Sequence, residues 1–230
     1  MRILITDGMD KAAMAQLREL GHEVVEQFYE PDQLGAALRD FDAVVVRSKT
    51  KVRANHIDEA KGGKLKLIIR GGVGVDNIDV KYAEENGIAV RNTPGASSQS
   101  VAELAMGHMF ACTRYISIAG HTMREGKWEK KAYGKGIELR GKTLGIVGFG
   151  RIGKCLARKL QSLGAAVTVA SRKAEDRAWC AALGYRPEQT HVYAHGLTYD
   201  CVLNTVPAPV FTEAQLATLR CPLVDLASAP

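Results

Sequence analysis

The chain has 230 residues and a mass of 24.9 kDa, which fits one large domain or two compact ones. With 46% hydrophobic and 24% charged residues it has the composition of a soluble globular protein, which excludes disordered, collagen-like and coiled-coil proteins. The net charge of +6 is concentrated in residues 121–160, which hold 11 basic and three acidic side chains. That segment has few aromatic residues and matches no nucleic-acid-binding module, so we expect no nucleic-acid partner.

The five cysteines are widely spaced and include no C-x-x-C pair, a pattern that predicts free thiols rather than a disulfide framework or a zinc site. They are Cys112, Cys155, Cys180, Cys201 and Cys221. No apolar stretch approaches the roughly 18 residues needed to span a membrane. We therefore expect a cytoplasmic protein with no membrane contact and no metal site.

The first part of the chain alternates short β-branched strands with helical segments, which is typical of a parallel sheet covered on both faces. Gly21 and Gly87 each separate a helix from a strand, as helix-ending glycines do. A turn-rich run at residues 92–98 marks the expected boundary between a domain of residues 1–96 and one of residues 97–230. The expected strands are 3–6, 23–26, 43–47, 67–69 and 88–90, and the expected helices lie near 11–20, 32–39, 54–61 and 79–86.

The second part opens with a helix and then repeats the strand–helix pattern. Ser100 and Glu103 have the spacing of a capping box, which predicts a helix from Ser100 to about Ile116 with apolar residues around most of its circumference. Residues 122–142 lack apolar periodicity and are expected to be a solvated connection. The later expected strands are 144–147, 167–170, 201–205 and 223–226, and the helices are 151–163, 175–183 and 213–219, the last behind the cap Thr212.

The most specific motif is a G-x-G-x-x-G run that follows a predicted strand and begins a predicted helix. A dinucleotide-binding turn requires this context. In it, Gly148 permits a tight turn, Gly150 lets the backbone approach a pyrophosphate, and Gly153 lets the helix pack close to the strand. The free N–H groups of Arg151 and Ile152 would face the phosphates. A glycine turn that only permits packing is the alternative interpretation.

The end of the next predicted strand indicates which dinucleotide is preferred. NAD-specific folds place an Asp or Glu there to bind the ribose 2′-OH. This strand instead ends in Ser171 and Arg172, which are suited to hold a 2′-phosphate through charge-assisted hydrogen bonds. We predict NADP(H) as the cofactor, with NAD(H) possible. An ordinary charged helix start formed by Arg172 and Lys173 is the alternative.

At the level of whole segments, the chain resembles the D-isomer-specific 2-hydroxyacid dehydrogenases, phosphoglycerate dehydrogenases in particular. The resemblance covers residues 1 to about 155 and rests on residues 67–79, 92–95, 100–104 and 139–148. It implies a flavodoxin-like substrate domain followed by a Rossmann domain, a homodimer, and hydride transfer between a nicotinamide cofactor and a 2-hydroxy or 2-keto acid. The resemblance also implies that Val73 and Gly74 hold the substrate carboxylate, while Arg47 and Ser48 reach a phosphate or a second carboxylate.

Beyond residue 155 the sequence is more similar to the A subunit of dipicolinate synthase, another NADP-type Rossmann protein, over residues 167–172, 203–210 and 224–228. We therefore interpret the chain as composite. In either family Thr205, Val206 and Pro207 would lie against the cofactor. A dipicolinate synthase A-like subunit is accordingly one alternative for the whole chain.

The family's catalytic Arg, Glu and His are not expected in this chain. The arginine position aligns with Ser228, and the glutamate and histidine would follow residue 230, together with a sixth strand and a helix returning to the first domain. His191 and His195 lie before the fourth strand of the second series and are interpreted as loop residues. Whether the chain is an enzyme thus stays open, and a catalytically incomplete or engineered cofactor-binding scaffold is the second hypothesis.

Overall fold

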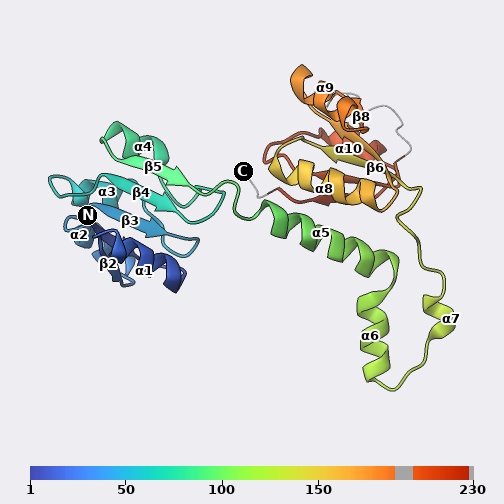
Figure 1. The fold of residues 1–230 in the computed structure, drawn as a ribbon, viewed down its shortest axis with the longest axis horizontal. Coiled ribbons are helices and arrows are strands. Elements are labelled where there is room, and N and C mark those ends of the chain that lie inside the picture. The colour runs from blue at the N-terminus through green and yellow to red at the C-terminus, as the bar shows by residue number, and fades with distance from the viewer. Residues whose placement is uncertain (190–198, 228–230) are drawn as a thin grey trace. The chain divides into compact units, whose positions relative to one another are not determined.

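The computed structural model describes residues 1–189 and 199–227 and divides the chain into two compact units, Met1–Ser97 and Ser98–Pro230. Each unit contains one five-stranded parallel sheet with helices on its faces (Figure 1). The alternation of strands and helices read from the sequence is therefore confirmed as an α/β fold.

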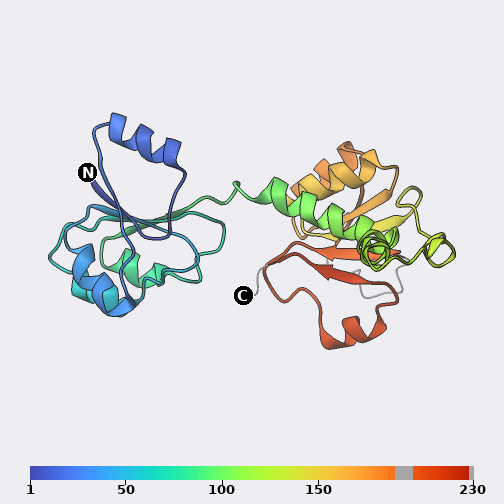
Figure 2. The same cartoon turned by 90° about the horizontal axis from the view of Figure 1, so that it is seen from below.

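The first unit has the strand order β2-β1-β3-β4-β5, which is the flavodoxin-like order. Its helix α1 lies on one face of the sheet, and α2, α3 and α4 lie on the other (Figure 2). Beside α1, an apolar groove of about 670 Å³ is lined by sheet residues that include Ile3, Val45 and Ile69. The elements are β1 (Arg2–Ile5), α1 (Lys11–Glu19), β2 (Glu23–Glu26), α2 (Pro31–Leu38), β3 (Ala43–Val46), α3 (Ala54–Ala60), β4 (Leu67–Arg70), α4 (Val80–Glu85) and β5 (Ala89–Asn92).

The core of the first unit lies between the sheet and α2, α3 and α4, where Val44, Ile57 and Ile68 are fully buried. Gly21 and Gly87, expected to end helices, have φ angles of +81° and +76°. Glycine adopts this left-handed conformation without the steric cost that a Cβ would add, so the chain can leave each helix and enter the next strand at once.

The second unit has the strand order β10-β9-β6-β7-β8. Renumbered within the unit, this is 5-4-1-2-3, the first five strands of the doubly wound Rossmann order. The elements are α5 (Ser98–Thr113), α6 (Ile116–Arg124), α7 (Lys130–Tyr133), β6 (Thr143–Val147), α8 (Arg151–Ser162), β7 (Ala166–Ala170), α9 (Ala174–Ala182), β8 (Arg186–Glu188), β9 (Cys201–Asn204), α10 (Glu213–Thr218) and β10 (Leu223–Asp225).

The expected start of the first helix of the second unit, at a capping box formed by Ser100 and Glu103, was wrong. Helix α5 begins at Ser98, so Ser100 and Glu103 lie inside it, and Glu103 accepts a hydrogen bond from Gln99 rather than capping the helix. Leu104, on the outer side of this helix, is 62% exposed. Only one side of α5 packs against α8 and the sheet, which leaves the opposite side open.

The segment expected to be a solvated connection, residues 122–142, contains the last residues of helix α6 and the whole of helix α7. Helix α6 has no buried residue, and the two helices lie beyond the end of α5, away from the sheet (Figure 1). Their side chains include Ile116, Ile118 and Met123, all at least 45% exposed, and Trp128 between the helices is 76% exposed. Because the preceding helix was expected to end near Ile116, α6 was missed, although Ile116, Ala119 and Met123 follow one another at helical spacing.

Candidate functional site

Two glycines of the turn between β6 and α8, Gly148 and Gly153, could not be replaced by another residue without a clash or strain. Gly148 has a φ angle of +96°, and a Cβ placed on it would lie 2.6 Å from Cγ2 of Val206 and 2.8 Å from Oγ1 of Thr205. A Cβ on Gly153 would overlap the carbonyl oxygen of Gly148. The first and third glycines of the motif therefore do what the sequence predicted, a tight turn and a close approach of helix to strand.

The second glycine, Gly150, has open space where the other two have neighbours. It is the N-cap of α8, and a Cβ built on it meets no protein atom within 4 Å. Arg151 and Ile152 are the first residues of this helix, whose initial N–H groups have no partner within the helix. This glycine-lined approach to the positive end of a helix fits the pyrophosphate of a dinucleotide.

The end of β9 lies beside the glycine turn. The Thr205 hydroxyl donates to the carbonyl oxygen of Val147 at 2.8 Å, which links the ends of β9 and β6. Asn204 holds the backbone two residues farther on, because its Nδ2 donates to the Val206 carbonyl at 3.2 Å and its Oδ1 accepts from the Val206 amide at 3.1 Å. The structure thus brings Thr205 and Val206 to the dinucleotide turn, with Pro207 exposed beside them.

Asn204 is a positioning residue that the sequence analysis missed. It is only 4% exposed, and its Nδ2 also donates to Oδ1 of Asp225 at the end of β10. The signal available in the sequence was a polar residue ending an otherwise apolar strand. Such a residue must find hydrogen-bond partners when it is buried, so it often organises the turn that follows.

At the end of β7, Ser171 and Arg172 occupy different environments. Ser171 is 6% exposed, and its hydroxyl donates to Oδ2 of Asp176 at 2.8 Å, whereas Arg172 is exposed. Nη1 of Arg177 donates to the carbonyl oxygens of Ser171 and Arg172, both at 2.8 Å. The strand end itself has no carboxylate, as the sequence indicated, but the fold brings one to it from the first turn of α9.

In the first unit, the loop after β3 is held from the end of β1. Oδ2 of Asp7 accepts from the amides of Arg47 and Thr50 at 2.7 and 3.0 Å, and Oδ1 accepts from the Thr50 hydroxyl at 2.6 Å. Arg47 and Ser48, the predicted anion-binding residues, are exposed on this loop and line an open pocket of about 370 Å³. The loop is thus fixed through its backbone while its side chains are free to face a ligand.

The Asp7 carboxylate links the stability of the first unit to pH. Partial burial would raise the pKa of Asp7, but the hydrogen bonds from Thr50 and Arg47 outweigh it and hold this pKa below its ordinary value of 3.8. A carboxyl whose pKa is depressed on folding contributes stability above its unfolded pKa, and that contribution is lost as pH falls through the folded pKa.

We expect the free energy of unfolding to fall as the pH drops below about 4, with Asp7 among its causes. Asp7→Asn should lower stability at pH 7, because an amide cannot accept three hydrogen bonds as the carboxylate does, and should flatten the dependence below pH 4. Urea titrations of both proteins at pH 7 and across the range of about pH 4 to 2 measure this. Equal slopes below pH 4 would contradict the assignment.

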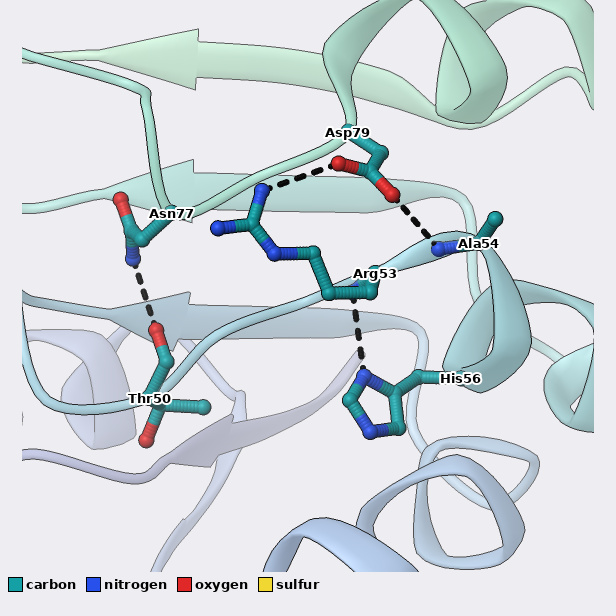
Figure 3. A network of polar contacts seen from close by, with 6 residues as sticks. All are labelled: Thr50, Arg53, Ala54, His56, Asn77 and Asp79. Atoms are coloured by element: carbon teal, nitrogen blue, oxygen red, sulfur yellow. Dashed lines mark hydrogen bonds and ion pairs between the residues drawn. The ribbon is translucent and has the colours of Figure 1, made fainter.

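A second bridge connects the loop after β3 to the loop after β4. Nδ2 of the buried Asn77 donates to the carbonyl oxygens of Arg47 and Thr50, each at 2.7 Å (Figure 3 draws the bond to Thr50). Val73 lies earlier in the loop after β4. It is 43% exposed, and its carbonyl oxygen accepts from Nδ2 of Asn92 at 2.6 Å. The structure therefore joins the Arg47–Ser48 loop to the loop that contains Val73 and Gly74.

Arg70, which sequence reasoning passed over, ends β4 just before this loop. Its Nε is buried and has no hydrogen-bond partner among the residues that the structure describes, and its Nη1 lies 3.5 Å from the Gly71 carbonyl oxygen. A buried guanidinium nitrogen without a partner is costly and marks a place where an anion would be favourable. A cation at the carboxyl end of a parallel strand was the signal in the sequence.

His56, which follows the loop after β3, has a structural role. Nδ1 of His56 accepts from the Arg53 amide at 3.0 Å (Figure 3). Nε2 therefore carries the proton, and it lies 2.9 Å from the Pro31 carbonyl oxygen. Arg53 also pairs with Asp79 at 2.9 Å, and Asp79 accepts from the Ala54 amide at 2.8 Å. Burial would raise the pKa of Asp79, but these two donors outweigh it and lower that pKa.

The other candidate groups add no second centre. His191, His195 and the position of Ser228 lie outside the described residues. Among residues 1–189 and 199–227, no cluster of three or more His, Cys, Asp or Glu residues could hold a metal ion. In the same part of the chain, no helix is both long enough and apolar enough to cross a bilayer.

The strand order of the second sheet and its glycine turn define an α/β protein whose second unit has a Rossmann-type fold. The comparisons with known proteins specify the family. The model of the D-isomer specific 2-hydroxyacid dehydrogenase catalytic domain matches residues 3–219, and the chain belongs to this family. The match extends well past residue 155, so it also covers most of the segment that the sequence related to dipicolinate synthase.

Individual relatives support this assignment. The chain is 50% identical over 164 residues to a hydroxypyruvate reductase of Thermotoga maritima and 46% identical over the same length to a D-3-phosphoglycerate dehydrogenase of Methanocaldococcus jannaschii. The aligned part is 71% of this chain but only 53% and 31% of those proteins. The chain therefore spans about half, or less, of the length of these relatives.

Solved structures match over almost the whole chain. The TT0316 protein of Thermus thermophilus aligns with a TM-score of 0.78 at 26% identity, covering 99% of this chain and 76% of that one. The apo-structure of D-lactate dehydrogenase from Escherichia coli aligns with a TM-score of 0.80 at 21% identity, over 99% of this chain and 76% of that one. The second likeness shows the shared fold alone.

Proposed function

We propose that this chain is an oxidoreductase that transfers hydride between a nicotinamide dinucleotide and a small 2-hydroxy or 2-keto acid. The observation that carries the proposal is the glycine turn at Gly148, Gly150 and Gly153, found in a chain of the 2-hydroxyacid dehydrogenase family. When bound, the nicotinamide supplies or accepts the hydride. The acids named for the relatives, hydroxypyruvate and 3-phosphoglycerate, belong to the proposed substrate class.

The chain's own residues would bind and orient the two reactants. The N–H groups of Arg151 and Ile152, at the start of α8, would hold the pyrophosphate, with Thr205, Val206 and Pro207 beside it. The backbone at Val73 and Gly74 would hold the carboxylate of the acid. An exposed peptide segment next to glycines offers N–H groups to an anion without side-chain obstruction.

A second anionic group on the substrate would meet the loop after β3. Arg47 and Ser48 are exposed there while Asp7 and Asn77 fix the loop's backbone, so the guanidinium is presented without the loop having to fold around the ligand. The guanidinium of Arg70 adds positive charge on the adjoining strand. A phosphate or a second carboxylate suits such a site, because a guanidinium binds either group through paired hydrogen bonds.

Titration of the chain with NADPH and NADH, followed by nicotinamide fluorescence, tests the proposal directly. Binding, followed by oxidation of the reduced nucleotide when a panel of 2-keto acids is added, is the expected result. Failure to bind either nucleotide would refute the proposal. Binding without oxidation of the nucleotide by any acid would instead favour a cofactor-binding scaffold without catalysis.

We propose NADP(H) as the preferred cofactor. The exposed Arg172 at the end of β7 supports this preference, since a guanidinium can form charge-assisted hydrogen bonds to a 2′-phosphate. Ser171 is the other residue proposed to contact the phosphate, although its hydroxyl donates a hydrogen bond to Oδ2 of Asp176 in this structure. If the Ser171 hydroxyl is to donate to the 2′-phosphate, its hydrogen bond to Asp176 has to break.

Arg172→Asp should shift the preference toward NADH by at least about tenfold, since the change removes the phosphate partner and introduces a like charge. The ratio of the Kd values for NADH and NADPH measures the effect. Lys173→Asp is the matched control, because it reverses the same charge one residue farther on, at the N-cap of α9. An unchanged ratio in the Arg172 variant would refute its role.

We also propose that the chain forms a homodimer in a reducing, cytoplasmic compartment. Exposed apolar side chains on and beside α6, with Trp128 at 76% exposure, support a partner on that part of the second unit. A second copy of the chain fits the family resemblance, and the mass measured by sedimentation equilibrium tests it. The free cysteines, including the exposed Cys112, support the compartment.

A further inference from the structure

The carboxylate of Asp176 occupies an unexpected place at the end of β7. It lies in the first turn of α9, and its Oδ2 accepts a hydrogen bond of 2.8 Å from the buried hydroxyl of Ser171. Arg177, the next residue, donates to the carbonyl oxygens of Ser171 and Arg172. The strand end, the following turn and the start of α9 are therefore tied together, and the carboxylate is held at the strand end rather than turned to solvent.

This place matters because of what the Rossmann topology puts there. In such folds the residue at the end of the second strand contacts the 2′ position of the adenosine ribose, and β7 is the second strand of this sheet. A carboxylate there accepts a hydrogen bond from a 2′-hydroxyl, but it repels a 2′-phosphate. Asp176 supplies a carboxylate to a strand end that has none of its own.

We infer that Asp176 is a specificity-determining residue that opposes the 2′-phosphate and so limits the preference for NADPH over NADH that Arg172 provides. The inference rests on the proposed dinucleotide-binding function. Two opposite charges thus act on the same position of the cofactor, one from the exposed Arg172 and one from the carboxylate bound to Ser171. With this arrangement the chain would still bind NADH, although Arg172 at the end of β7 favours NADPH.

The test is Asp176→Asn in the full chain, with Kd measured for NADPH and NADH by nicotinamide fluorescence. Asparagine keeps an oxygen that accepts from Ser171 and removes only the charge, so the ratio of Kd for NADH to Kd for NADPH should rise about tenfold. Glu175→Gln is the matched control, because it removes the same charge from the same turn of α9, at an exposed residue, and leaves the bond between Ser171 and Asp176 in place. Its ratio should change less than about twofold.

The alternative is that Asp176 only stabilises the start of α9, where a negative charge is favourable. In that case the melting temperature of Asp176→Asn would fall and the two Kd values would change by the same factor, which would overturn the inference. An equal change of the ratio in Glu175→Gln would overturn it too. Asp176→Ser, a second neutral variant, must move the ratio in the same direction and serves if the asparagine variant does not fold.

Failure of this inference can be told from failure of the proposed function. If the unaltered chain binds neither nucleotide, the dinucleotide site itself is refuted, and the inference about Asp176 falls with it. If the chain binds both nucleotides but the ratio is indifferent to the charge of Asp176, only the specificity role is refuted.

Discussion

Gly150→Ala should weaken nucleotide binding by at least about a hundredfold while leaving the second unit as stable as before. The reason is that a methyl group at this position meets no protein atom within 4 Å and so costs the fold nothing. The backbone there has a φ angle of −75°, which alanine adopts freely. The same methyl group would occupy the open side of the turn, where the pyrophosphate has to approach the first N–H groups of α8.

Gly153→Ala is the informative counterpart, because its methyl group would overlap the carbonyl oxygen of Gly148. The helix has to move away from the turn, at a cost of about 1–3 kcal/mol in stability. Thermal unfolding and fluorescence titration of both variants therefore separate the two roles of the motif. If Gly150→Ala bound NADPH as tightly as the unaltered chain, the phosphates would not lie at this turn. An undiminished melting temperature for Gly153→Ala would show that the turn relaxes freely.

The parts of the fold that the sequence predicts well are those decided by local rules. Alternating strands and helices, the left-handed glycines Gly21 and Gly87, and the cap of α10 at Thr212 all follow from residues close together in the chain. Thr212 accepts from the Gln215 amide, and the Gln215 side chain accepts in return from the Thr212 amide, a pairing visible as a three-residue spacing. The glycine motif belongs to the same class.

Elements decided by tertiary contacts were missed or misplaced. Strand β8 has three residues, including Pro187, and a proline cannot donate to a sheet, so no strand was expected there. The strand exists because it forms the edge of the sheet beside β7. The start of α5 was misplaced because the spacing of Ser100 and Glu103 satisfies a capping rule that the fold does not use.

The candidate site shows the same division. Gly148, Gly150 and Gly153 were found because their spacing is fixed by one turn. Contacts that join separate elements carry no such spacing. The bond between Ser171 and Asp176 depends on the direction in which α9 leaves the strand, and the bonds from Asn77 depend on two loops that are 27 residues apart meeting at the same edge of a sheet. The sequence shows that these side chains can form hydrogen bonds, but it does not show which groups they bond to.

Asn77→Asp should destabilise the first unit by about 2–4 kcal/mol, although the two side chains have nearly the same shape. The amide nitrogen of Asn77 donates to the carbonyl oxygens of Arg47 and Thr50, whereas an ionised carboxylate can only accept. The variant would leave both carbonyls without a donor and would bury a negative charge beside them. Urea unfolding measures the loss.

Asn55→Asp is the control for this change, because Asn55 is exposed on α3 and its replacement should alter stability by less than about 0.5 kcal/mol. Amide hydrogen exchange gives a local readout, since the Thr50 amide is protected by Asp7 only while the loop is held in place. Faster exchange at Thr50 in the Asn77 variant, with unchanged exchange in α1, would show that the bridge fixes this loop. A variant as stable as the unaltered chain, with Thr50 equally protected, would mean that the amide bridge does not hold the two proposed substrate loops together.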